Sequence, residues 1–263
     1  MLHVVRSELT RLGQRRTLLV WFGLLALFAL MINTVMASVG DQAARGLPAP
    51  GVVFPTREQL EAPSGVMVGL SAASSMFGLV TLSVWAWFTA QDYSSGLIRL
   101  LVAAEPRRWR LLAGKVVALL LVTAVAATVA AFVNVIAAPI VGASGISTAA
   151  WGTDAPSVVV TAWTHLYLSQ VVWGVLGLVI AVVSRSAVVA VAIGAGYLLL
   201  VETMLKMANG VPSDWLLGST LNAIASGGTA SVSFSAALAL GGAYVIVGLV
   251  LAGVVLTRRD VTD

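Results

Sequence analysis

A carboxylate and an amine lie four residues apart near the end of a long apolar run, at Glu202 and Lys206. A carboxylate within a membrane span is a candidate proton site or substrate contact, because charged groups are costly there and are usually functional. Glu before Lys at this spacing also forms a favourable ion pair on one helix face. We favour the ion pair, since both residues fall near the predicted outer interface. Glu202 and Lys206 are therefore the candidate intramembrane polar site.

Ser144 lies in the sequence Gly-Ala-Ser-Gly at residues 142–145, which is similar to the Gly-x-Ser-Gly of rhomboid-type intramembrane proteases. A serine nucleophile needs a general base nearby. The candidate base is His165, which falls in the very next span, whereas the protease pattern has its His on the last span. We therefore disfavour a protease and expect no catalytic residue.

Metal and nucleotide chemistry lack their usual residues. The chain has no Cys and two His, which argues against thiolate and histidine metal sites. It also lacks the Gly-x-x-x-x-Gly-Lys-Ser/Thr loop that binds nucleotide phosphates. The sequence therefore predicts that this chain is not an enzyme and binds no cofactor or metal.

The composition is that of an integral membrane protein. Hydrophobic residues make up 59% of the chain, charged residues 10%, and the mean hydropathy is +0.98. Ordinary soluble domains are about 45–50% apolar. The basic residues flank apolar runs instead of forming one basic domain, which argues against nucleic-acid binding. We expect the lipid bilayer as a partner and no nucleic acid.

Long uncharged runs predict the membrane spans, since about 20 apolar residues cross a bilayer as a helix. The last run, Trp215 to Thr257, would be about 64 Å long as one helix, about twice the hydrocarbon thickness. Gly227 and Gly228 supply a break, so 207–232 is predicted to be a re-entrant segment that dips and returns. Six spans remain, at about 17–37, 64–90, 114–140, 161–183, 187–206 and 233–257.

The basic residues predict the orientation. With six spans both termini share a side, and that side holds twelve of the fifteen Lys and Arg residues. Basic residues gather on the cytoplasmic side of membrane proteins. We expect a multi-pass protein of the cytoplasmic (plasma) membrane with both termini in the cytoplasm. The residues expected to anchor the inner interface are Arg6, Arg11, Arg15, Arg107, Arg108, Arg110 and Lys115.

Residues 1–16 are predicted to form an amphipathic helix ahead of the first span. Apolar residues repeat at 3-4-3 spacing, at Leu2, Val5, Leu9 and Leu12. The arginines fall mainly on the opposite side, which suits a helix lying on the inner leaflet. Two interpretations stay open: a plain positive-inside anchor, or a connection between a cytoplasmic partner and the first span.

The segment from Ala90 to Lys115 holds five of the fifteen basic residues and lies between two long apolar runs. A short segment this basic belongs on the cytoplasmic side. Its first half predicts a short amphipathic helix that is presented to a cytoplasmic partner. The candidate docking residues are Asp92, Tyr93, Gly96, Leu97, Arg99, Leu100 and Leu101.

These features together resemble the membrane subunit of type 2 ABC exporters over essentially the whole chain. An acidic residue, a Gly and a basic residue follow the second span, at Asp92, Gly96 and Arg99. A Pro with basic residues (106–108) and a hydrophobic-Gly-Lys sequence that ends at Lys115 come next. The resemblance implies that 92–104 is a coupling helix that docks in a cleft of an ATPase subunit. It also implies a second permease subunit, identical or paralogous, and ATP with Mg on the ATPase.

The expected fold is an all-α integral membrane protein with an interfacial helix at 1–16 and a six-span permease domain at 17–263. A cytoplasmic coupling helix and an outer re-entrant segment complete it. The expected function is the permease subunit of an ABC-type exporter that moves an amphipathic, drug-like or lipid-like substrate. The alternatives are an ion-coupled secondary transporter that uses Glu202, or a membrane assembly protein that transports nothing.

Overall fold

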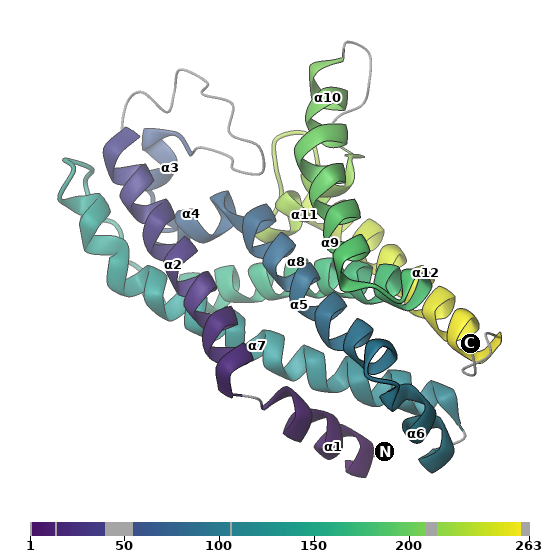
Figure 1. The fold of residues 1–263 in the computed structure, drawn as a ribbon. Helices are drawn as coiled ribbons and strands as arrows, with labels where there is room; N and C mark the ends of the chain where they lie inside the picture. The colour runs from purple at the N-terminus through teal and green to yellow at the C-terminus, as the bar shows by residue number, and fades with distance from the viewer. Residues whose placement is uncertain (1, 14, 40–54, 106, 209–214, 259–263) are drawn as a thin grey trace.

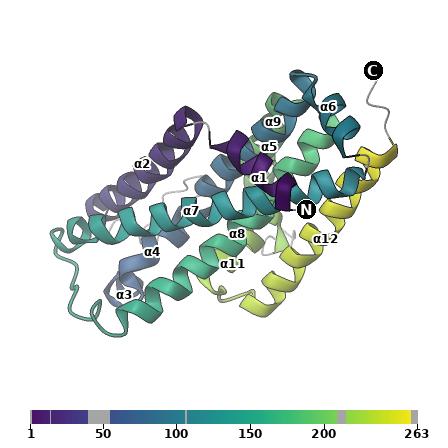
Figure 2. The ribbon, with the colours of Figure 1, turned by 90° about the horizontal axis from the view of Figure 1, so that it is seen from below.

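The computed structural model describes residues 2–13, 15–39, 55–105, 107–208 and 215–258. In these residues every regular element is a helix, apart from an isolated β-bridge between Gly228 and Ser233. The long helices form a bundle in which α1 and α6 lie at one end and α3, α4 and α11 lie toward the other (Figure 1). The view from below shows α1 lying against α7, and α6 near the C-terminal end of α12 (Figure 2).

The first half of the chain holds seven of the described helices. They are α1 (Leu2–Leu12), α2 (Arg15–Val39), α3 (Arg57–Glu61), α4 (Gly65–Ala72), α5 (Ser74–Ser94), α6 (Leu97–Ala104) and α7 (Arg108–Gly142). The short α3 begins with a reciprocal cap, in which the Thr56 side chain accepts the Gln59 N–H and the Gln59 side chain accepts the Thr56 N–H. Such a capping box satisfies backbone donors that the first helical turn leaves free.

The second half begins with α8 (Ala155–Ser184), which carries a Pro in its first turn. A 21-residue helical stretch then runs from Ala187 to Met207. It consists of α9 (Ala187–Gly196), the π-helical turn η2 (Tyr197–Val201) and α10 (Glu202–Met207). α11 (Leu217–Ser226) ends at Gly227, which is left-handed, and α12 (Phe234–Arg258) follows.

Several of these helices can cross a membrane by length and composition. In the described residues they are α2, α7, α8, the stretch 187–207 and α12, together with α4 and α5 if this bent pair counts as one span. The pair is bent by 51° at the break between them. Each span predicted from the sequence overlaps one of these candidates, although α7 and α8 begin about six residues earlier than predicted.

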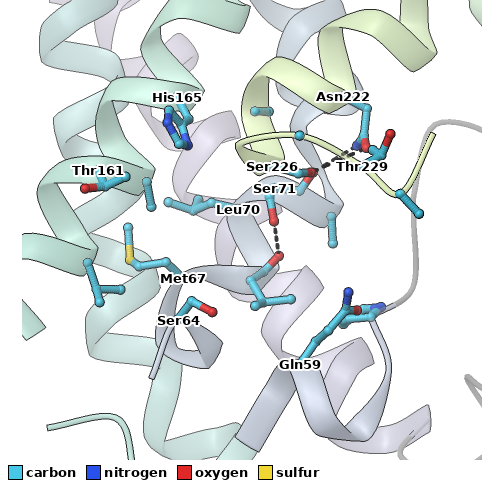
Figure 3. A pocket seen from close by; sticks show the side chains of 18 of the residues that line it. Gln59, Ser64, Met67, Leu70, Ser71, Thr161, His165, Asn222, Ser226 and Thr229 are labelled. Carbon is cyan, nitrogen blue, oxygen red and sulfur yellow. Dashed lines mark hydrogen bonds between the residues drawn. The ribbon is translucent and has the colours of Figure 1, made fainter. Parts of the chain in front are cut away.

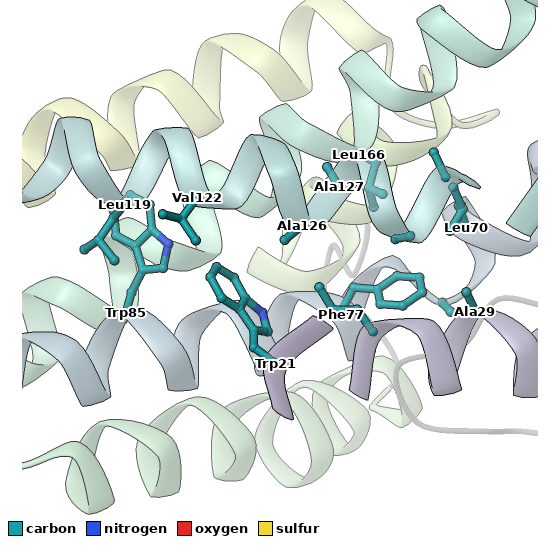
Figure 4. Packing of buried hydrophobic residues seen from close by; sticks show 14 of the residues in the cluster. Trp21, Ala29, Leu70, Phe77, Trp85, Leu119, Val122, Ala126, Ala127 and Leu166 are labelled. Carbon is teal, nitrogen blue, oxygen red and sulfur yellow. The ribbon is translucent and has the colours of Figure 1, made fainter. Parts of the chain in front are cut away.

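The core is built where α5 packs closely against α8 and reaches α7 through the side chain of Trp85. Trp85 of α5 lies against Leu119 and Val122 of α7 (Figure 4), and its indole N–H donates to Thr123 Oγ1 at 2.9 Å. A Cβ added at Gly174 of α8 would lie 2.5 Å from the Trp85 ring. The absence of a side chain at Gly174 therefore lets α5 and α8 approach each other closely.

A second tryptophan makes the reverse contact between the same helices. Trp173 of α8 is buried, and a Cβ added at Gly78 of α5 would overlap its ring. The sequence places Trp173 in mid-span and predicts that it packs inside the bundle, which the structure confirms. Each helix thus contributes one tryptophan and one glycine to the contact.

The sequence predicts hydrogen bonds between helices for Asn33, Asn134, His165 and Gln170. The described residues show such bonds for Asn33, Asn134 and Gln170 and none for His165. The Asn33 amide donates to Asn134 Oδ1 at 2.9 Å and so links α2 to α7. Thr81 Oγ1 of α5 donates to Gln170 Oε1 of α8 at 2.7 Å. These bonds satisfy buried amides that would otherwise be costly in an apolar interior.

Candidate functional site

The short helix α6 is separated from α5 by Ser95 and Gly96, of which Gly96 is left-handed. α5 continues to Ser94, and Gly96 has φ 68° and ψ 3° immediately before α6 begins at Leu97. Glycine adopts this conformation without steric cost. The chain therefore changes direction at Gly96, and α6 projects past the end of α5 (Figure 1).

α6 buries one apolar residue and leaves another outside. Ile98 is buried, Leu97 and Leu101 are half-buried, and Leu100 is 69% exposed. Arg99 lies on the outward part of the helix beside Leu100. This arrangement presents a leucine and an arginine at the end of the bundle where α1 also lies.

The structure corrects the predicted docking helix at its start. Asp92 and Tyr93 belong to the last turn of α5, not to the helix that follows. The ring of Tyr93 lies 5.8 Å from the guanidinium of Arg185, and Asp92 is 2% exposed. Both side chains therefore make contacts within this chain, and the projecting helix comprises residues 97–104.

Asp92 belongs to a cluster of four charged residues that joins α1, α5 and α7. Lys115 Nζ lies 2.8 Å from Asp92 Oδ2 and 3.1 Å from Glu8 Oε2. Arg11 Nη1 lies 2.7 Å from Glu8 Oε1, and its other terminal nitrogen pairs with Asp92. We call Glu8, Arg11, Asp92 and Lys115 the four-charge cluster.

The four-charge cluster is electrically balanced and largely buried. Two carboxylates face two cations, and Glu8, Asp92 and Lys115 are all buried. Burial lowers the pKa of Arg11, but the hydrogen bond and charge of Asp92, together with Glu8, more than compensate and raise it above its ordinary value. Removing one member would leave an unpaired buried charge, which is strongly destabilising.

This cluster changes the interpretation of the predicted interface anchors. Arg11 and Lys115 face carboxylates inside the chain and not a surrounding lipid layer. Among the α1 side chains that the structure describes, the buried ones are Val4, Glu8 and Leu12, one every four residues, whereas Val5 and Leu9 are half-buried. Gly114 permits the contact with α7, because a Cβ there would lie 2.5 Å from Val4 Cγ1.

The other predicted anchors lie around the same end of the bundle. Arg108 Nη1 donates to the carbonyl of Leu256 in α12 at 2.8 Å. Arg110 lies 3.7 Å from Glu105 Oε2, with its guanidinium 5.5 Å from the Trp109 ring. Arg6 and Arg107 are exposed, and the side chain of Arg15 lies outside the described part of the chain.

The predicted polar pair forms in the helical stretch 187–207. Lys206 Nζ lies 2.8 Å from Glu202 Oε1, and Glu202 is 1% exposed. The carboxylate also accepts the Gly218 N–H at 2.7 Å and the Ser219 hydroxyl at 3.3 Å. Glu202 thus holds the first turn of α11, where free N–H groups attract negative charge.

The π-helical turn explains why Tyr197 takes part in the same contact. The Tyr197 hydroxyl accepts the Leu217 N–H at 3.3 Å, next to the bond from Gly218 to Glu202. Residues five apart point in different directions on an α-helix, with 3.6 residues per turn. A turn with i to i+5 bonds brings them nearly into line. Tyr197 and Glu202 therefore reach the N-terminus of α11 together.

Ser144 and His165 do not form a nucleophile and base pair. The Ser144 hydroxyl donates to the carbonyl of Val141 at 2.6 Å. The His165 ring lies against Phe234, with ring centroids 4.5 Å apart. No hydrogen bond joins Ser144 to His165 in the described residues, so this arrangement does not activate the serine.

An apolar groove of about 710 Å³ opens between α2, α5 and α9. It is bordered by Val20 of α2, Trp87 of α5 and Val188 of α9, all of them exposed. Ser83 is the one hydroxyl among its described lining residues. Such a surface suits a hydrocarbon chain or an aromatic ring.

Residues 26–262 match the family described as protein of unknown function (DUF2705). The match begins within α2 and therefore covers the helices from α3 to α12, while α1 lies outside it. No curated protein matches the chain.

Proposed function

The chain belongs to the DUF2705 family of proteins of unknown function, and we propose that it is the permease subunit of an ABC-type exporter. A separate ATPase subunit hydrolyses ATP, and this chain moves an amphipathic, drug-like or lipid-like substrate across the cytoplasmic membrane. A second permease subunit, identical or paralogous, completes the transport path. This chain itself supplies no catalytic residue.

In this proposal six spans cross the membrane, and both termini are cytoplasmic. The spans are α2, α4 with α5, α7, α8, the stretch from α9 to α10, and α12, while α11 is the re-entrant element before the last span. Two observations support it: the basic residues at the α1/α6 end, and the burial of α11, whose Leu221, Ala223 and Ile224 are fully covered.

The observation that carries the proposal is the projecting helix α6. It is short, begins after the left-handed Gly96, and exposes Leu100 at the end of the bundle next to Arg99. A short helix with an exposed apolar residue fits a groove on a partner protein. Since the chain has no nucleotide-binding loop, energy from ATP must reach it through a contact of this kind.

The four-charge cluster gives such a contact a route into the spans. Asp92 lies in the last turn of α5, four residues before Gly96, and is bound to α1 through Arg11 and to α7 through Lys115. A displacement of α6 would therefore move three helices as one body. Motion of rigid elements about a few hinge residues is a common way to transmit conformational change.

The groove between α2, α5 and α9 supports an apolar or amphipathic cargo. Its described lining is almost entirely aliphatic, with Trp87 at its edge. Proton coupling through Glu202 receives less support, because the carboxylate already binds Lys206, Gly218 and Ser219. We therefore keep ATP-driven export as the proposed function.

Co-purification of the native complex in mild detergent tests the proposal. We expect an ATPase subunit to be recovered with the wild-type chain and to be lost, by about tenfold or more, with Arg99→Glu/Leu100→Asp. Placing an unpaired carboxylate in an apolar contact costs more than the about 1.4 kcal/mol that corresponds to tenfold. Leu100 is chosen because its exposure leaves the fold of this chain unaffected.

The matched control is Arg99→Lys/Leu100→Met, which keeps charge and apolar character and should retain the ATPase. Equal recovery with both double variants would mean that α6 is not the docking helix. A wild-type complex that contains no ATPase would contradict the proposed function itself.

A further inference from the structure

A cavity of about 600 Å³ lies at the end of the bundle remote from α1 and α6. We call it the distal cavity. Its wall comes from three places in the chain: α3 and α4, the first third of α8, and the end of α11 with the loop after it. Residues from all three line the cavity, among them Gln59, Thr161 and Asn222 (Figure 3).

The break between α4 and α5 creates one side of the distal cavity. The 51° bend turns α4 away from the line of α5. Because the helix is interrupted there, backbone carbonyls at the break lack the N–H partners that a continuous helix would provide. The Asn222 amide donates to the Ser71 carbonyl at 3.3 Å and to Ser74 Oγ at 3.2 Å. Gln170 Nε2 donates to the Ser74 carbonyl at 3.2 Å. The bend is thus fixed by neighbouring helices.

The lining offers neutral hydrogen-bonding groups. None of its described residues carries a formal charge at neutral pH, with His165 taken as neutral. Among the described residues, the Ser64 and Thr161 hydroxyls, the Gln59 amide nitrogen and the His165 ring nitrogens make no hydrogen bond within the chain. These four side chains can therefore bind a ligand without breaking existing bonds.

Apolar groups complete the wall. Apolar lining residues come from α4 and α8: Met67, Val68, Leu70, Val158 and Ala162. The volume falls within the range of about 300–1,000 Å³ that is typical of small-molecule sites. Such sites combine apolar walls with a few convergent polar groups that fix orientation. The pattern fits a ligand with several hydroxyls and CH groups but no charge.

We propose that the distal cavity binds an uncharged polyhydroxylated group, the chemistry of a sugar, either on a membrane lipid or free in solution. Hydroxyls of the ligand exchange hydrogen bonds with Gln59, Thr161 and His165, and its CH groups contact Met67 and Ala162. An anionic group is disfavoured, because no cation among the described lining residues offsets its desolvation. The site needs no ATPase and stands apart from the transport function proposed above.

Ligand binding to the purified full-length chain tests this proposal. The protein is purified in lauryldimethylamine oxide, since a maltoside detergent would compete for the site. Equilibrium dialysis measures binding of labelled maltose, and nanodiscs measure retention of glucosyl-diacylglycerol against phosphatidylglycerol. We expect saturable binding of maltose, or preferential retention of the glucosyl lipid, and the two results distinguish the free from the lipid-borne source.

Two threonines one turn apart on α8 provide matched variants. Thr161 lines the cavity, whereas Thr164 bonds the Val160 carbonyl of its own helix at 2.8 Å and lies outside the lining. Thr161→Val should weaken binding about three- to tenfold, the effect of one net hydrogen bond. Thr164→Val should leave it unchanged, and Ala162→Trp should abolish it by filling the cavity.

Three results would overturn the proposal. They are the absence of binding by both sugar probes, preferential retention of phosphatidylglycerol, and an equal effect of Thr161→Val and Thr164→Val. Because the assay contains no ATPase, its failure would leave the exporter proposal untouched.

Discussion

The carboxylate of Glu202 binds the start of a helix to which it does not belong. The sequence predicts its pairing with Lys206, because four-residue spacing on a helix is a local property. The bonds from Gly218 and Ser219 could not be predicted, since they depend on how α11 folds back against the stretch 187–207. The contact of Tyr197 with α11 could not be predicted from the sequence either, because its alignment with Glu202 requires a π-helical turn.

Glu202→Gln should loosen the first turn of α11 while the rest of the bundle stays folded. The Gln side chain keeps one oxygen acceptor, but its NH2 group places a hydrogen-bond donor next to three other donors. These are the Lys206 ammonium, the Ser219 hydroxyl and the Gly218 N–H. We expect a loss of about 1.5–3 kcal/mol, the range for hydrogen bonds to charged groups. Hydrogen exchange of the Leu217–Ser226 peptide should accelerate, and the unfolding midpoint in detergent should fall.

Lys206→Met serves as the comparison for this prediction. Lys206 is 46% exposed. Without it the Glu202 carboxylate still accepts the Gly218 N–H and the Ser219 hydroxyl, so Lys206→Met should accelerate exchange in α11 less than Glu202→Gln does. If Glu202→Gln and Lys206→Met accelerated hydrogen exchange in α11 equally, the bond from the Gly218 N–H to the Glu202 carboxylate would not stabilise that helix.

Among the helices, the boundary between α5 and α6 shows what the sequence pattern could and could not locate. The resemblance to ABC exporter subunits implied a docking helix over 92–104, and the residues that project are 97–104. Asp92 was included as the acidic residue that follows the second span in that resemblance. In the structure Lys115 and Arg11 neutralise it, so α5 continues past it to Ser94. Gly96 was the available signal for the boundary.

Gly96→Ala and Gly23→Ala should change stability in opposite directions. A Cβ added at either position would have no neighbouring atom within 4 Å. The change in stability therefore depends on the backbone conformation alone. At Gly96 the left-handed conformation penalises alanine by about 1–2 kcal/mol. At Gly23, inside α2, alanine should stabilise the helix by about 0.5–1 kcal/mol. Unfolding midpoints of the two variants measure the difference, and a stabilising Gly96→Ala would mean that α5 and α6 do not need a left-handed residue between them.

Across the whole molecule, α5 connects the two ends that carry the proposals. Asp92 in its last turn enters the four-charge cluster, and Ser74 in its first turn borders the bend beside the distal cavity. The sequence predicted the order of the apolar helices from composition alone. It did not predict that Glu8 joins Asp92 and Lys115, since that contact requires α1 to fold back on α7. The acidic residue within the basic segment 6–16 was the available hint.

The paired tryptophan and glycine contacts between α5 and α8 should make that connection rigid, and a double-mutant cycle tests this. Gly78→Ala should destabilise the protein by about 1–3 kcal/mol, because its Cβ would overlap the Trp173 ring. Trp173→Phe alone should also destabilise, by leaving a void. Since the smaller ring makes room for the added methyl, the double variant should lose less than the sum, with a coupling of about 0.5–3 kcal/mol. Strict additivity in detergent unfolding would show that α5 and α8 adjust independently, and the two ends of the molecule would then not be joined through this contact.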